Sequence, residues 1–269
     1  MTISKKTDKI KNPFASAKFK KTKIKSHLNK NYHFDNFIEC DSNQFARKTG
    51  LFVAANIHEN PFNPLFIFGG VGTGKTHLAY SIGNEIKKRF LKKNVLYVSA
   101  DTFTQQYINS VKKNIRDEFI RFYKLIDVLI IEDVQFLSGK SGTQDVFFHI
   151  YNYLYQNRKQ IIFTSDKAPV DMEDIDQRLL SRFKCGFLLE LTQPIKNTHQ
   201  FLTNYLTYHN IKMSEEIIEY LAQNEEFNLR VLKGFLLYAK AEYLFNGNEI
   251  TLELAKKNFE KLMGKPKTN

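Results

Sequence analysis

The chain contains at residues 69–76 the sequence Gly-Gly-Val-Gly-Thr-Gly-Lys-Thr, which has the spacing G-x-x-x-x-G-K-S/T. Glycines and a small threonine let the backbone turn tightly, so that successive N–H groups point inward and bind anionic oxygens. The ammonium group of Lys75 can reach the β- and γ-phosphates of a nucleotide, and the hydroxyl of Thr76 can bind Mg²⁺. The residues expected to hold the phosphates and the metal ion are Gly70, Gly72, Thr73, Gly74, Lys75 and Thr76.

The residues around this loop favour a phosphate site over a chance glycine-rich turn. An apolar run at residues 64–68 predicts a buried strand before the loop. After the loop, apolar residues recur at helical spacing at Leu78, Ile82 and Ile86. A strand, a glycine loop and a helix in this order place bound phosphates at the N-terminus of the helix.

Two further apolar runs end in acidic residues that a nucleotide site needs. Residues 127–131 are followed by Glu132 and Asp133. One of these carboxylates can hold Mg²⁺ and the other can orient an attacking water, although paired acids also occur as helix caps. Asp166 follows the run at residues 160–164, and in a parallel sheet it would lie beside the γ-phosphate. Taken alone, Asp166 is weak support, because aspartate often starts a turn.

Three arginines have spacings that fit phosphate chemistry, and each also fits a solvent-exposed surface. Arg178 and Arg182 are four residues apart on one face of an expected helix. Arginine stabilises the charge of phosphoryl transfer from the same chain or from a neighbour, but such a pair also forms surface salt bridges. Arg230 opens a later helix, where it can touch a γ-phosphate or simply face solvent.

Strands and helices alternate along most of the chain and then give way to helices only, which predicts an α/β fold followed by a helical unit. The expected strands span residues 64–68, 94–98, 127–131, 160–164 and 186–190. The expected helices between them span residues 75–90, 101–111, 115–122, 143–157 and 175–181, and the later ones span 195–208, 214–224, 228–245 and 251–262. We therefore expect a nucleotide-binding domain at residues 32–193 with a parallel sheet and helices on both faces, a small all-α lid at 194–262, and a tail at 263–269.

The charge of the chain is concentrated at one end. The net charge is +12, and residues 1–31 hold ten lysines against one acidic residue, Asp8, which leaves +3 for the rest. This segment has few apolar residues and is expected to be disordered. It fits both a nucleic-acid arm and a solvated linker.

Cysteine usage and hydropathy bound the cellular compartment. Two distant cysteines, Cys40 and Cys185, favour a reduced cytoplasmic protein over a disulfide scaffold. No apolar run approaches the ~20 residues of a membrane helix, and no hydrophobic segment follows the basic N-terminus as in a secretory signal. The expected location is the cytoplasm, with no membrane span.

Several segments together resemble the AAA+ ATPase module of the DnaA family of bacterial replication initiators, from Tyr32 to about Leu262. These segments are residues 32–37, 63–72, 134–140, 142–144, 147–149 and 178–183. The resemblance implies a P-loop AAA+ fold with ATPase activity, binding of ATP and Mg²⁺, head-to-tail self-association with ATP, and contact with single-stranded DNA. A full-length initiator or a helicase is a further expected partner.

The resemblance also implies a role for individual residues. Lys75 and Thr76 are expected to be the Walker A lysine and a Mg²⁺ ligand. Glu132 and Asp133 are expected to be the Walker B pair, with Glu132 also at the metal, and Asp166 is expected to be sensor I. The residues expected at the nucleotide outside the loop are Phe37, Ile38, Asn43, His77 and Arg230, the last as the sensor II arginine.

Other implied roles concern contacts outside the chain's own pocket. Arg182 resembles an arginine finger that reaches the ATP of a neighbouring subunit, and Arg178 resembles a second residue at that interface. In the family, a helical insertion after the second strand contacts single-stranded DNA. Here it would span residues 103–123, with Ile108 and Lys140 at the positions that face the DNA.

The sequence departs from the family pattern in places, and other functions stay open. Glu132 stands where aspartate is usual, which predicts slow hydrolysis, and Val231 and Lys233 replace an acidic pair. The family's helicase-contact and helix-turn-helix domains have no counterpart in these residues, so duplex origin recognition by this chain alone is not expected. The alternatives are an Hda-like regulator, whose short clamp-binding peptide is not found in residues 1–31, and a DnaC-like helicase loader, which residues 134–143 fit less well.

Overall fold

The structure is a computed structural model that describes residues 24–192, 198–224, 229–246 and 250–262. Its centre is a five-stranded sheet in which all neighbouring strands are parallel, in the order β2-β3-β4-β1-β5. The strands are β1 (Leu65–Phe68), β2 (Val95–Ser99), β3 (Val128–Glu132), β4 (Gln160–Ser165) and β5 (Phe187–Glu190). They consist mainly of Val, Ile, Leu and Phe, as expected where helices cover both faces of a parallel sheet. The predicted α/β fold is confirmed.

The strand register gathers the polar residues at one edge of the sheet. Ser99 at the end of β2 pairs with Glu132 at the end of β3, and Phe68 at the end of β1 pairs with Ser165 at the end of β4. The glycine loop follows Phe68 and Asp166 follows Ser165. These segments, distant in sequence, therefore meet at the carboxyl edge, where open α/β sheets bind their ligands.

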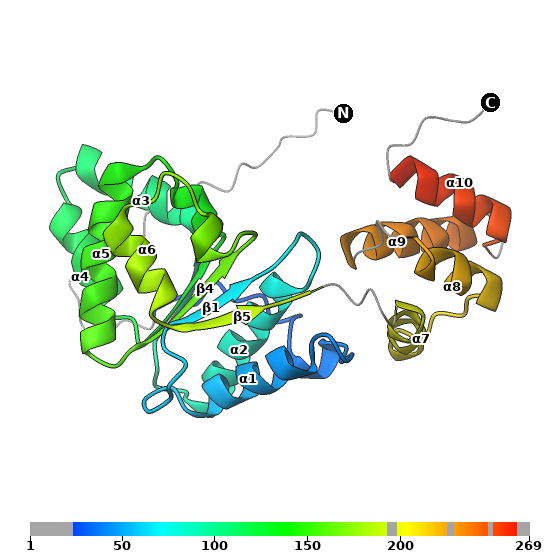
Figure 1. Ribbon diagram of the computed structural model, residues 1–269, viewed down its shortest axis with the longest axis horizontal. Coiled ribbons are helices and arrows are strands. Elements are labelled where there is room, and N and C mark those ends of the chain that lie inside the picture. Colours follow the sequence, from blue (N-terminus) through cyan, green and yellow to red (C-terminus); the bar gives the residue numbers. More distant parts are fainter. Residues whose placement is uncertain (1–23, 193–197, 225–228, 247–249, 263–269) are drawn as a thin grey trace.

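Helices cover both faces of the sheet (Figure 1). One face carries α1 (Gln44–Ala55) and α2 (Lys75–Arg89), and the other carries α3 (Ala100–Lys112), α4 (Arg116–Lys124), α5 (Ser141–Gln156) and α6 (Gln177–Lys184). Alternate side chains of β3 enter different apolar cores: Ile130 packs with α1 and α2, whereas Leu129 and Ile131 pack with the other helices. Short 3₁₀ helices, η1 (Phe34–Asn36), η2 (Val134–Leu137) and η3 (Pro169–Asp171), lie in the connections.

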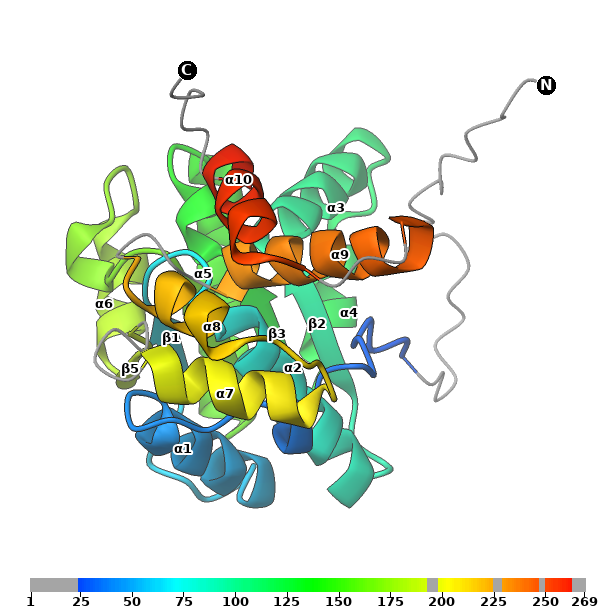
Figure 2. The ribbon, with the colours of Figure 1, turned by 90° about the vertical axis from the view of Figure 1, so that its right-hand side faces the viewer.

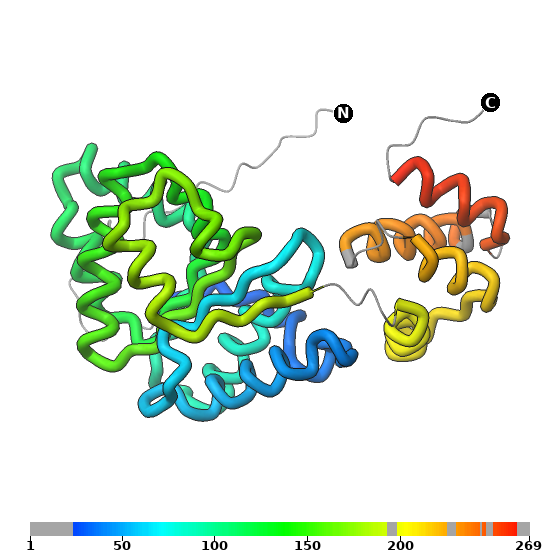
Figure 3. The backbone as a smooth tube through the Cα atoms, in the orientation of Figure 1, coloured from blue at the N-terminus to red at the C-terminus, as the bar shows by residue number. Residues whose placement is uncertain are grey.

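The last four helices, which we call the lid, pack around an apolar core of their own. They are α7 (Thr198–Tyr208), α8 (Glu215–Ala222), α9 (Leu229–Asn246) and α10 (Leu252–Leu262). Leu202, Ile217 and Phe235 are fully buried among them, and Ile38, from the segment before α1, packs against the same core. Figure 3 traces the lid beside the sheet, and Figure 2 looks through the lid toward it. In the described part of the chain, no helix is long and apolar enough to cross a membrane.

Part of the basic N-terminal segment, residues 24–31, packs on the sheet. The expectation of disorder through residue 31 is wrong for residues 24–31. Ile24 and Leu28 pack against the two cores of the sheet, and the N–H of Tyr97 donates to the carbonyl of Ser26 over 2.9 Å. The amide of Asn84 also donates to the backbone carbonyls of residues 29 and 32. Apolar side chains and backbone hydrogen bonds attach residues 24–31 to the sheet in spite of their lysines. Residues 1–23 and 263–269, also predicted as tails, lie outside the described residues.

Candidate functional site

The glycine loop joins β1 to α2, and two of its glycines have conformations that favour glycine. Gly72 and Gly74 have φ values of 79° and 101°, in the left-handed region where a Cβ atom is strained. Gly74 is the N-cap of α2, so the loop ends at the free N–H groups of the first helical turn. This arrangement presents backbone donors and the positive end of a helix to an anion.

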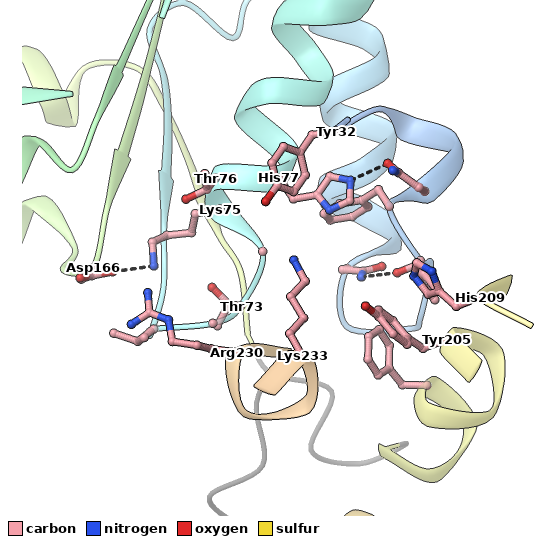
Figure 4. Close-up of a pocket in the computed structure, with 18 of the residues that line it drawn as sticks. Tyr32, Thr73, Lys75, Thr76, His77, Asp166, Tyr205, His209, Arg230 and Lys233 are labelled. Atoms are coloured by element: carbon pink, nitrogen blue, oxygen red, sulfur yellow. Dashed lines mark hydrogen bonds and ion pairs between the residues drawn. The ribbon is translucent and has the colours of Figure 1, made fainter. Parts of the chain in front are cut away.

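The ammonium group of Lys75, at the end of the glycine loop, contacts one carboxylate oxygen and two backbone carbonyl oxygens. Its ammonium group is 2.6 Å from a carboxylate oxygen of Asp166, and it donates to the carbonyls of Gly69 and Gly70 over 2.7 and 2.8 Å. The residue is buried, with 6% of its surface exposed. The structure thus brings together the predicted lysine and the predicted acid of β4, as Figure 4 shows.

A group of acidic side chains lies beside the lysine at the ends of β3 and β4. The hydroxyl of Thr76 donates to the carboxylate of Glu132, so the two expected Mg²⁺ ligands are in contact. Mg²⁺ is usually held by one or two carboxylates together with substrate phosphates, and this donor set fits it. Burial, reinforced by the charge of Glu132, raises the pKa of Asp133. These carboxylates fit a divalent cation, which would offset their mutual repulsion.

Gln135 is a site residue that the motif analysis did not single out. Its side-chain amide donates to Asp133 over 3.4 Å and to Asp166 over 3.3 Å, and its amide oxygen accepts from the N–H of Asp166. Asp133 itself has a left-handed backbone with φ 56°, held by a hydrogen bond from its N–H to the hydroxyl of Thr164. Gln135 therefore links the acids that follow β3 and β4, and only the tertiary structure reveals this link.

A pocket of about 390 Å³ opens between the loop and the lid. The predicted residues that line it are Phe37, Ile38, Asn43, Gly72, Thr73, Gly74, Lys75, Thr76, His77, Asp133, Asp166 and Arg230. Sequence analysis did not predict Tyr32, Asn36, Val71, Phe201, Tyr205, His209 and Lys233 as lining residues. Gly70 and Glu132 are not in the lining but contact it through Lys75 and Thr76. Both the sheet and the lid therefore contribute to one site.

One end of the pocket is aromatic. The ring of His77 lies edge-on to Tyr32 and Phe37, with centroids 4.9 and 5.2 Å apart. Burial, opposed by a hydrogen bond to the carbonyl of His33 and assisted by the charge of Lys233, lowers the pKa of His77 to about 4. This end suits a flat heterocycle, whereas the loop end suits phosphates.

The depressed pKa of His77 makes stability depend on pH in a defined direction. The neutral ring contributes stability that is fully present above the unfolded pKa of 6.5 and is lost as the pH falls toward 4. Between pH 7.5 and pH 4.5 we expect the parent to lose on the order of 2 kcal/mol more unfolding free energy than His77→Phe, which has no proton to gain. Urea unfolding of both proteins at the two pH values measures the difference, and equal losses would contradict the assignment.

The arginines of α6 lie away from the pocket lining. Arg178 is 3.0 Å from Asp176 and 3.7 Å from Asp145, and its guanidinium lies over the ring of Phe148. Arg182 lies over the same ring at 5.7 Å. The structure does not bring Arg182 to the pocket of its own chain, so a role at a nucleotide would require a neighbouring subunit.

The predicted DNA-facing residues lie on α3 and immediately before α5. Ile108 on α3 is 36% exposed. Lys140, immediately before α5, forms an ion pair with Asp101 of α3 over 2.8 Å. Neither residue lines the pocket, so contact with a nucleic acid and with a nucleotide would use different surfaces.

Comparison with known proteins places the chain in a family. Residues 28–190 match the family described as Bacterial DnaA ATPase domain. The chain belongs to this family. The chromosomal replication initiator protein DnaA of Flavobacterium psychrophilum is 57% identical over 262 residues, which cover 97% of this chain and 55% of that protein. The chain therefore spans about half the length of the DnaA relatives it matches.

Solved DnaA structures have the same fold as this chain. The crystal structure of domain III of Thermotoga maritima DnaA has a TM-score of 0.81 and 35% identity, and the match covers 89% of this chain and 99% of that one. A structure described as replication initiator DnaA bound to AMPPCP and single-stranded DNA has a TM-score of 0.78 and 39% identity, and covers 86% and 70% of the two chains.

Proposed function

We propose that the chain is the ATP-dependent assembly module of a DnaA-type replication initiator, and that it binds ATP with Mg²⁺, associates head to tail and contacts single-stranded DNA. The observation that carries this proposal is the pocket in which the glycine loop, the acids of β3 and β4, and Arg230 of the lid meet. The DnaA relative bound to AMPPCP and single-stranded DNA supports it.

The residues of the pocket suggest how ATP is held. The phosphates would lie against the N-terminus of α2, with Lys75 at the γ-phosphate in place of its present contact with Asp166. Thr76 and Glu132 would hold Mg²⁺, which would supply positive charge to offset that of the phosphates. Arg230 would add a cation from the lid, so that occupancy by ATP favours closure of the lid on the sheet.

The acidic residues favour binding over rapid turnover. Asp133, which accepts a hydrogen bond from Gln135, would orient an attacking water. Glu132 has one more methylene than the aspartate usual in the family, so it would hold Mg²⁺ less favourably, and we expect hydrolysis to be slow. The pocket then acts as a switch with a long-lived ATP state.

Shortening the carboxylate tests this switch. Glu132→Asp is expected to raise the rate of ATP hydrolysis about tenfold, because one better-placed metal contact is worth on the order of 1.4 kcal/mol in the barrier. Release of phosphate in single-turnover reactions measures the change. Glu190→Asp, the same substitution at an exposed position of β5, is the matched control. An unchanged or lower rate in Glu132→Asp would contradict the proposal.

Gel filtration with ATP or ADP, with and without single-stranded DNA, tests the proposed function as a whole. We expect assemblies larger than a monomer with ATP, further enlarged by DNA, and a monomer with ADP. A chain that binds ATP but stays monomeric under all conditions would contradict self-assembly and favour the regulator or loader alternatives. A chain that binds no nucleotide would contradict the entire proposal.

A further inference from the structure

Two amide side chains that line the pocket, Asn43 and Asn36, are hydrogen-bonded to backbone groups of their own segment. Asn43 accepts from the N–H of Cys40 through its amide oxygen and donates to the carbonyl of Ile38, both over 2.9 Å. Its amide therefore shapes the loop before α1. These two contacts fix the orientation of the Asn43 amide, with one N–H and one oxygen lone pair in use.

Asn36 is held in one orientation by its neighbours. Its side-chain nitrogen donates to the carbonyl of Asn31 over 2.6 Å, and its side-chain oxygen accepts from the N–H of His33 over 2.9 Å. The donor and the acceptor of the amide are thus assigned by backbone groups whose roles are unambiguous. The oxygen of Asn36, an acceptor only, is the atom that faces His77.

This orientation decides the tautomer of His77. Its Nε2 lies 2.9 Å from the amide oxygen of Asn36 and 3.3 Å from the carbonyl of His33. Both partners can only accept, so Nε2 carries the ring proton and donates it. A neutral imidazole has one such proton, and Nδ1 is therefore a bare lone pair that can only accept.

With Nε2 engaged by Asn36 and His33, Nδ1 is the ring nitrogen of His77 that is left for a ligand. His77 lines the pocket, and its ring is fixed edge-on between Tyr32 and Phe37. The hydrogen bond from Nε2 goes to Asn36, and Figure 4 shows this bond leaving the ring of His77 on the side away from Lys75 and Asp166. Among the described residues, no protein group hydrogen-bonds to Nδ1. The site thus holds a rigid acceptor at its aromatic end.

We propose that Nδ1 of His77 accepts a hydrogen bond from the exocyclic amine of adenine, which makes His77 a specificity-determining residue of the nucleotide site. The inference rests on the proposed function, since it assumes that a nucleotide occupies the pocket. The amine is the only hydrogen-bond donor on the adenine ring of ATP, and the aromatic surroundings of His77 suit the base. A nucleotide whose base has a carbonyl in place of the amine would place an acceptor oxygen against Nδ1 of His77, which also only accepts.

The test compares ATP with purine riboside triphosphate, which lacks only the exocyclic amine, by calorimetric titration of the full chain with Mg²⁺. The parent is expected to bind ATP about tenfold more tightly, the effect of one hydrogen bond to a fixed acceptor. His77→Phe, which keeps the ring packing without the acceptor, is expected to bind both nucleotides equally. His77→Gln, whose amide oxygen can accept, is expected to recover part of the preference, and thermal unfolding checks that both variants fold.

The outcomes separate this inference from the proposed function. If the parent binds both triphosphates with equal affinity, or if His77→Phe keeps the tenfold preference, His77 does not recognise the amine. If His77→Phe instead removes a preference for ATP over 2′- or 3′-deoxy-ATP, the donor is a ribose hydroxyl and the inference is wrong. If the parent binds neither triphosphate, the proposed function fails with it.

Discussion

Replacing Lys75 with alanine is expected to lower the affinity for ATP at least about 100-fold, equivalent to roughly 2.7 kcal/mol of binding free energy. The ammonium group is buried at the base of the loop, within reach of where the phosphates would lie. Its removal leaves the terminal phosphate without its cation in a setting where charge-assisted hydrogen bonds are strong. Calorimetric titration with ATP and Mg²⁺ measures the loss.

The matched control for this change is Lys88→Ala. Lys88 is exposed near the end of the same helix, so its substitution removes the same charge without touching the pocket. We expect it to bind ATP as the parent does, within about twofold. Because Lys75→Ala also leaves Asp166 without its ion pair, thermal unfolding must show that the variant is folded. Tight ATP binding by a folded Lys75→Ala protein would mean that the nucleotide lies elsewhere.

The second large effect is expected from Arg182→Ala, and it should separate binding from assembly. Arg182 lies outside the lining of its own pocket, so the affinity of the monomer for ATP is expected to stay within about twofold. The concentration needed for ATP-dependent assembly is expected to rise at least tenfold, because an arginine that contacts a neighbour's phosphates in a dry interface contributes roughly 1.5 kcal/mol or more. Light scattering across a concentration series with ATP measures it.

Lys184→Ala is the control for this prediction, since Lys184 is an exposed cation on the same helix, α6. Arg178 would not serve as a control, because the family resemblance implies that it lies at the same interface. If Arg182→Ala assembles with ATP at the same protein concentration as the parent, Arg182 is not the arginine finger. A loss of ATP affinity in the monomer would instead show that Arg182 acts within its own chain.

The strands were predictable because their signal is local. The apolar runs that became β1 to β4 are buried on both faces, β5 at the edge of the sheet is partly exposed, and each run is ended by glycine or polar residues. Helix α1 was not predicted, and its sequence shows why. Phe45 and Phe52 are 64% and 43% exposed, and Gly50 lies within the helix, so apolar residues do not fall on one face. Aromatic neighbours such as Phe62 cover part of that surface, which no local pattern reveals.

The site residues that lie in one contiguous motif were also predictable, whereas those brought in by the tertiary structure were not. Contiguous residues from Gly72 to His77 were predicted and all line the pocket. Tyr205 and Lys233 were not predicted as lining residues, because each lies on a separate lid helix whose sequence carries no nucleotide-binding motif at that position. Gln135 was visible as part of a family segment, but its link to two carboxylates depends on the register of β3 and β4. The roles assigned to individual residues remain predictions until the variants are measured.

Gly69, the first residue of the loop, is required for close packing of the loop against the chain that follows β5, independently of phosphate binding. A Cβ atom at this position would lie 2.0 Å from the carbonyl oxygen of Leu191, just beyond β5 and before the lid. The N–H of Leu191 donates to the carbonyl of Phe68 over 2.7 Å. The segment that leaves β5 toward the lid is therefore hydrogen-bonded to the end of β1, where the glycine loop begins. A genetic screen that scores nucleotide binding would therefore misclassify Gly69→Ala as a ligand-contact mutation. Its defect would arise from misplacing the chain that carries the lid, and excess ATP would not correct it.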